Sequence, residues 1–158
     1  METSNQLANR FREVFSNGTW IANTNYKDQL SEVNLKQAIT KIGSLNSILA
    51  LTYHINYYVA GVLQVFEGGN LDIRDKYSFD FPDIKSEEEW NVLFNDLLSN
   101  AEKFASHIEL MPNEKLEDNF VDKKYGSYRR NIEGMIEHSY YHLGQISLIR
   151  KMILDLDN

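Results

Sequence analysis

Four segments of this chain repeat apolar residues with the 3.6-residue period of an amphipathic helix, and no other feature of the sequence limits its fold as strongly. Each apolar face must pack against another apolar face to be stable. Four such helices joined by longish connectors are the ingredients of a four-helix bundle, so we predict an all-α fold in one domain over residues 1–158. The expected helices cover residues 3–17, 44–67, 86–111 and 127–153.

Signals at the helix ends support these four segments. Thr3 and Ser86 each have a Gln or Glu three residues later, which is the pattern of a capping box. Gly18 is expected to close the first helix in a left-handed conformation, and the third helix should end before Pro112. The side chains predicted to cap the four helix starts belong to Thr3, Ser44, Ser86 and Ser127.

Two features stand outside this simple pattern. Residues 19–43 have no sustained period, so we expect a connector with a short helix near Ser31–Ile39, and an extended hairpin is the alternative. Gly61, Gly134 and Gly144 lie inside predicted helices, where each glycine costs about 1 kcal/mol relative to alanine. A packing or binding role is therefore worth seeking at these three positions.

Composition excludes several classes of protein. The chain has no cysteine, which rules out disulfide scaffolds, thiolate metal sites and cysteine nucleophiles. Its formal charge of −7 and the lack of a basic stripe argue against a nucleic-acid partner. No apolar run approaches the roughly 20 residues of a membrane span, and the polar N-terminus does not resemble a secretory signal. We therefore expect a cytoplasmic protein without a membrane or nucleic-acid partner.

Three histidines are the strongest candidates for a functional site. His138 and His142 are four residues apart on the last predicted helix, which places both imidazoles on one face, about one turn apart. His54 lies at the margin of the apolar face of the second helix. Three imidazoles converging from two helices would hold one divalent metal and leave a coordination position open, as in catalytic zinc sites. Tyr58, one turn after His54, is the first candidate for the lining of an adjoining pocket.

Other interpretations of these histidines exist. Helical spacing alone also fits two partly exposed histidines and one hydrogen-bonded boundary histidine that bind no metal. A zincin motif is excluded because Ser139, not glutamate, follows His138, and the Glu-x-x-His pattern of di-iron bundles is absent. His107 has no neighbouring ligand and is expected at the surface or its boundary. Glu137 points away from the apolar face and is left out of the site.

The chain resembles the DinB-like family of four-helix-bundle metalloenzymes. The resemblance spans almost the whole chain and is carried by two segments, of which the second is the more specific: Gly43-Ser44-Leu45 through Tyr53-His54-Ile55, and Glu137-His138-Ser139-Tyr140-Tyr141-His142-Leu143-Gly144-Gln145-Ile146. In that family a histidine in the first half of the chain and a His-x-x-x-His pair on the last helix are the metal ligands. The resemblance places His54, His138 and His142 in these roles.

The same resemblance implies further properties. These are an up-down-down-up topology, a homodimer, and zinc or nickel as the metal. Relatives suggest transfer of a low-molecular-weight thiol to a small electrophile, and hydrolysis by a metal-activated water is the chemically related alternative.

The competing hypothesis is a metal-binding or stress-response module without turnover, for which a closed metal site is expected. Trp20 and Ile21, apolar residues of the first connector, could contribute to a dimer face.

Overall fold

The computed structural model describes residues 1–156 and confirms the all-α expectation, because no strand forms among them. Four helical segments are long when α1 is counted together with its π-helical continuation η1, and the other helices are short. In chain order the elements are α1 (Ser4–Arg12), the π-helical continuation η1 (Glu13–Asn17), α2 (Tyr26–Leu30), α3 (Leu35–Ile39), α4 (Ile48–Phe66), the 3₁₀ turn η2 (Asp75–Tyr77), α5 (Glu87–Leu110), the 3₁₀ turns η3 (Asn113–Glu117) and η4 (Lys123–Tyr125), and α6 (Tyr128–Leu156).

Three of the four predicted caps are confirmed. Thr3 and Ser86 each form a complete capping box with the side chain three residues later. The Ser127 hydroxyl accepts a hydrogen bond from the Arg130 amide at 3.2 Å, just before α6. Three of the long helices therefore begin where local sequence signals place them, and α5 ends at Leu110, before Pro112.

Ser44 does not cap the second helix, so this prediction was wrong. The cap is Ser47, whose hydroxyl accepts a hydrogen bond from the Ala50 amide at 3.2 Å. Gly43 has a φ of +54°, and the chain after it turns before the helix begins. Both serines precede apolar residues at helical spacing, so local pattern could not separate them. Gly18 is also not left-handed, because its φ is −122°.

The first connector contains two short helices and no hairpin. The predicted helix near residues 31–39 is confirmed in part as α3, which Asn34 caps. The additional helix α2 is fixed to α6, since the buried Tyr26 hydroxyl donates to the Ser139 carbonyl at 2.7 Å. Trp20 is 88% exposed and Ile21 is exposed as well, but the dimer remains a prediction.

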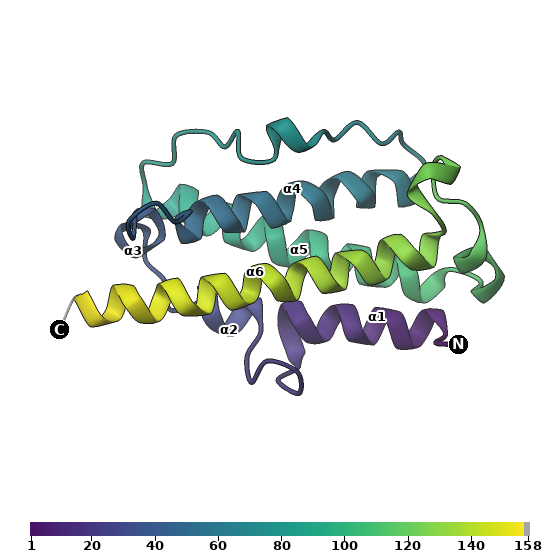
Figure 1. Cartoon of the computed structure of the whole chain (residues 1–158), viewed down its shortest axis with the longest axis horizontal. Coiled ribbons are helices and arrows are strands. Elements are labelled where there is room, and N and C mark those ends of the chain that lie inside the picture. The colour runs from purple at the N-terminus through teal and green to yellow at the C-terminus, as the bar shows by residue number, and fades with distance from the viewer. Residues whose placement is uncertain (157–158) are drawn as a thin grey trace.

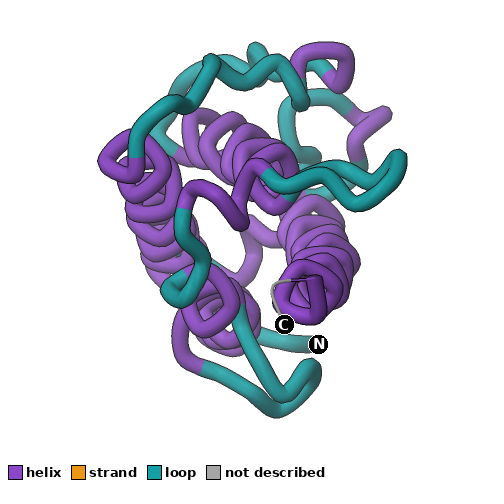
Figure 2. The backbone as a smooth tube through the Cα atoms, turned by 90° about the vertical axis from the view of Figure 1, so that its left-hand side faces the viewer, coloured by secondary structure: helices purple, strands orange, loops and turns teal. Residues whose placement is uncertain are grey.

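The long helices, which Figure 2 shows in a view close to their axes, pack around one continuous apolar core. Phe11 of α1 stacks on Phe15 and on Phe104 of α5, with ring centroids 4.8 and 4.3 Å apart. At the opposite end, the Trp90 indole is fully buried and donates to the Val33 carbonyl at 2.7 Å. These contacts tie the N-terminal helices and the first connector to α5.

Helices α4 and α5 run in the same direction, because the connector between them returns along the length of α4 (Figure 1). The parallel course is also evident from side-chain pairs. Asn100 of α5 donates to Asn56 of α4 at 3.0 Å, and further along both helices Phe66 lies 4.8 Å from Phe104. Residues 67–86 therefore form a strap on the outer face of α4.

The strap is fastened to α4 by a series of side-chain contacts. Gly61 allows the closest approach, because a Cβ atom there would lie 2.3 Å from Cγ2 of Ile73. One turn earlier, the Tyr57 hydroxyl accepts from the Arg74 amide at 2.8 Å and donates to its carbonyl at 3.1 Å. The helix glycine Gly61 thus has a packing role. No helix within residues 1–156 combines the length and the apolar character needed to cross a membrane.

Candidate metal centre

The three predicted histidines come together at the contact between α4 and α6. One ring nitrogen from each of His54, His138 and His142 lies within 4.8 Å of the other two. The Nε2 atoms of His54 and His138 are 3.2 Å apart. Two nitrogen ligands of a tetrahedral zinc ion, with bonds of about 2.0–2.1 Å, are expected to lie about 3.3 Å from each other. The three side chains therefore lie close enough to bind one metal ion.

The helices explain why these side chains meet. His138 and His142 project from successive turns of α6, as their spacing predicts, and His54 faces them from α4, across 84 residues of sequence. Only 7% of His54 and 7% of His142 is exposed, while His138 is half-buried at the rim. The shared face of His138 and His142, which their spacing predicts, is thus observed.

Gln145 fixes the ring of His142. Its Oε1 atom lies 2.6 Å from His142 Nδ1, so the proton of the neutral ring stays on Nδ1 and the lone pair of Nε2 is left free. Such a partner on the non-coordinating nitrogen is usual for histidines that bind metals. The Nδ1 atom of His54, in contrast, is buried and makes no hydrogen bond of ordinary geometry. The cluster thus has an unsatisfied polar atom among the buried groups of the core.

The environment favours neutral imidazoles, the form that binds a metal. Burial, followed by the proximity of His142 and His138, lowers the pKa of His54 to about 4, although the Ser78 carbonyl and Asp75 oppose this. Burial is also the main cause that lowers the pKa of His138 and the pKa of His142. At neutral pH all three donor atoms are therefore available without loss of a proton.

Aromatic rings and one carboxylate surround the histidines. Phe79 of the strap stacks on His54 with ring centroids 4.2 Å apart, and Tyr58 lies 5.0 Å from His54 and 5.3 Å from His138. The Tyr58 hydroxyl donates to Asp75 Oδ1 at 2.8 Å. Burial, together with this hydrogen bond, raises the pKa of Tyr58, so its phenol stays protonated at neutral pH. The predicted position of Tyr58 beside the histidines is thus observed.

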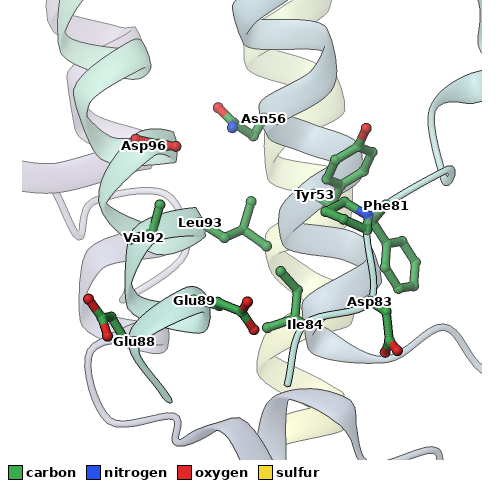
Figure 3. A pocket seen from close by; sticks show the side chains of 11 residues that line it. Tyr53, Asn56, Phe81, Asp83, Ile84, Glu88, Glu89, Val92, Leu93 and Asp96 are labelled. Atoms are coloured by element: carbon green, nitrogen blue, oxygen red, sulfur yellow. The ribbon is translucent and has the colours of Figure 1, made fainter. Parts of the chain in front are cut away.

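Other residues considered at the sequence level lie outside the cluster. The fourth histidine, His107, is partly exposed and has a carboxylate oxygen of Glu67 3.9 Å from its Nε2. Glu137 is exposed and pairs with Arg130 at 3.1 Å. Tyr53, which precedes His54 in the chain, lines a separate cavity beside Phe81 (Figure 3).

Sequence reasoning missed three residues around the cluster: Phe79 and Gln145 contact a histidine, and Asp75 is bonded to Tyr58. Asp75 and Phe79 belong to the strap, whose irregular sequence has no period that places side chains. Gln145 could have been found, because it lies three residues after His142 and therefore on the same helix face. Together these residues complete the surroundings of the histidines.

A cavity of about 540 Å³ adjoins the cluster between α4, α6 and the strap. Both His138 and Tyr58 line it, so one side of the histidine cluster faces an opening large enough for a small molecule. Within residues 1–156, no fourth histidine or carboxylate joins the three donors. The arrangement thus combines three ligands with an adjacent cavity.

Comparison with known proteins does not add to this picture, since no family model, curated protein or solved structure matches the chain.

Proposed function

We propose that this protein is a metal-dependent enzyme in which His54, His138 and His142 hold one divalent ion. The observation that carries the proposal is the convergence of three neutral imidazoles beside a cavity that His138 itself lines. Structural zinc sites are closed by a fourth protein ligand, whereas catalytic sites keep one position for water or substrate. Three protein donors beside a cavity support a site of the second kind.

The bound ion would supply an electrophilic centre that lowers the pKa of a thiol or water molecule, making it a nucleophile near neutral pH. The residues of the chain have supporting roles. Gln145 orients His142, and the rings of Phe79 and Tyr58 limit the access of water to His54. Because the Tyr58 hydroxyl donates its hydrogen bond to Asp75, the phenol oxygen can act toward a substrate as a hydrogen-bond acceptor.

We propose further that the chain belongs to the DinB-like family and that its long helices form the up-down-down-up bundle of that family. The parallel course of α4 and α5 supports this assignment. On this basis zinc or nickel is the expected metal, a cytoplasmic homodimer the expected assembly, and transfer of a low-molecular-weight thiol the expected reaction, with hydrolysis as the related alternative.

Elemental analysis of untagged protein, purified without chelator, tests the metal site. We expect about one equivalent of metal in the wild type and its loss in His54→Ala and His142→Ala. His107→Ala is the matched control, since it removes the histidine that lies outside the cluster. Failure of the wild type to bind added zinc or nickel would overturn the proposal.

Activity assays then separate an enzyme from a metal-binding module. Metal-loaded protein would be screened for transfer of small thiols to an electrophilic aryl halide and for hydrolysis of aryl esters. Turnover that disappears in His138→Ala but persists in His107→Ala would support the enzyme. One equivalent of bound metal without turnover in either screen would favour the module.

A further inference from the structure

The cavity beside the histidine cluster has a distinct lining. One wall comes from α4, another from the first half of α6, and the remainder from the strap and the loop before α6. Its apolar surface is formed mainly by Val62, Leu71, Ile73, Phe120 and Met135. Such a surface accommodates the hydrocarbon part of a small molecule, and burying it there is favourable by roughly 25 cal/mol per Å² of apolar area.

Two arginines provide the charge of this cavity. Arg74 comes from the strap and Arg130 from α6, and both line the cavity. The Arg74 side chain has no hydrogen bond or ion pair with any residue of the described chain, since only its backbone is bonded to Tyr57. Arg130 pairs with the exposed Glu137, which does not line the cavity. Its guanidinium therefore extends along α6 as far as the exposed Glu137, the residue before His138.

The carboxylate of Asp75 is the single acidic group of the lining, and the Tyr58 hydroxyl donates to it. Two guanidinium groups and one carboxylate line the cavity, and Glu137 balances the charge of Arg130 from outside the lining. The side chains alone are therefore close to balanced, and a divalent ion on the neutral histidines would make the site positive. The local charge therefore favours an anion over a cation of similar shape.

The cavity on the other side of α4 shows the contrast. Its floor is also apolar and its volume is about 480 Å³, but acidic side chains stand around it (Figure 3). These are Asp83, Glu88, Glu89 and Asp96. No arginine or lysine lines it. The two cavities therefore differ in charge, and the one that adjoins the histidines is the one that two arginines line.

Gly134 leaves room in the cavity beside the histidines. It lines the cavity from α6, and a Cβ atom built at this position would meet no atom within 4 Å beyond its own stretch of the helix. No neighbouring chain segment needs this glycine for close packing, in contrast to Gly61. Its effect is to keep the space beside His138 open.

We propose that this cavity binds the substrate of the metal site and that the substrate has an apolar body and a carboxylate recognised by Arg74 and Arg130. This inference rests on the proposed function. Guanidinium groups suit this role because their planar donors match the two oxygens of a carboxylate. The apolar body lies against Val62 and Met135, and the reactive part of the molecule faces His138.

Calorimetric titration of zinc-loaded protein with three probes tests the charge preference. The probes are 3-phenylpropionate, the neutral 3-phenylpropanamide and the cationic 3-phenylpropylamine. We expect the carboxylate to bind roughly tenfold or more tightly than the amide, the effect of one charge-assisted contact. The double variant Arg74→Gln/Arg130→Gln should remove this difference and leave the amide unaffected. Lys103→Gln removes one exposed cation outside the cavity and is the charge control.

Two helix glycines provide a test of the cavity itself. Gly134→Leu should block all three probes while one equivalent of metal stays bound. Gly144→Leu is the matched control, because Gly144 also lies in α6 next to open space but does not line this cavity. Both substitutions gain helix propensity, so loss of binding in the first alone is not a folding effect.

The outcomes separate this inference from the proposed function. Equal affinity for carboxylate and amide, or full carboxylate binding in the double arginine variant, would overturn the inference while the metal content stays intact. A wild type that binds no zinc would overturn the proposed function. The titrations would then be made on metal-free protein, where the same dependence on Arg74 and Arg130 is required.

Discussion

Replacement of Gln145 by methionine is expected to weaken metal binding without unfolding the protein. Methionine matches the length of glutamine but cannot accept a strong hydrogen bond from His142 Nδ1, which now lies 2.6 Å from Oε1. A hydrogen bond to a group that gains positive charge contributes about 1.5–3 kcal/mol. Since about 1.4 kcal/mol corresponds to a factor of ten, the zinc dissociation constant should rise about 10- to 100-fold.

The assay is competition with a chromophoric chelator at pH 7, with circular dichroism as the check on folding. Gln145→Glu is the informative control, because a carboxylate accepts the same Nδ1 proton and makes the ring more basic. Its zinc affinity should equal or exceed that of the wild type. If Gln145→Met binds zinc within twofold of the wild type, Gln145 does not orient His142 and the argument fails.

Three other perturbations test the structure. Gly61→Ala should destabilise the fold by about 1 kcal/mol, because the cost of overpacking against Ile73 exceeds the gain in helix propensity. Limited proteolysis should cut the loosened strap faster than in the wild type, and a variant that is more stable in urea would contradict the close approach of Ile73 to Gly61. The metal-free protein should lose stability as the pH falls from about 6.5 toward 4. In this range His54 takes up a proton in the unfolded chain but not in the folded protein, where its pKa is lowered to about 4. Urea midpoints should show a smaller loss of stability in His54→Gln than in the wild type, and equal losses in the two proteins would refute this explanation. Trp90→Phe should cost about 2–4 kcal/mol, because it leaves a void and an unpaired Val33 carbonyl in the core; thermal unfolding measures this, and zinc stoichiometry should be unchanged.

Features that depend on neighbours within one or two helical turns could be predicted from the sequence. The capping boxes of Thr3 and Ser86 are local, and so is the shared face of His138 and His142. His54 was placed at the core margin by the apolar pattern of its own helix. That these two helices bring the histidines together is not encoded in either local pattern, and only the family resemblance implies that His54, His138 and His142 form one ligand set.

Features that depend on an irregular segment could not be predicted. Phe79 covers His54 because the strap has one fixed register on α4, and that register is set by individual fits such as Ile73 against Gly61. No repeating pattern encodes such a fit. The shift of the helix start from Ser44 to Ser47 has a similar cause, because the conformation of Gly43 decides it.

The distance along the chain between the two halves of the histidine cluster has a consequence for biosynthesis. His54 is translated 84 residues before His138, so the first ligand leaves the ribosome long before its partners exist. A single imidazole holds a metal weakly, and tight binding requires that α6 has docked on α4. If the protein holds a metal ion as we propose, uptake of the ion follows completion of the fold, and a newly made chain cannot bind one tightly before α6 is in place.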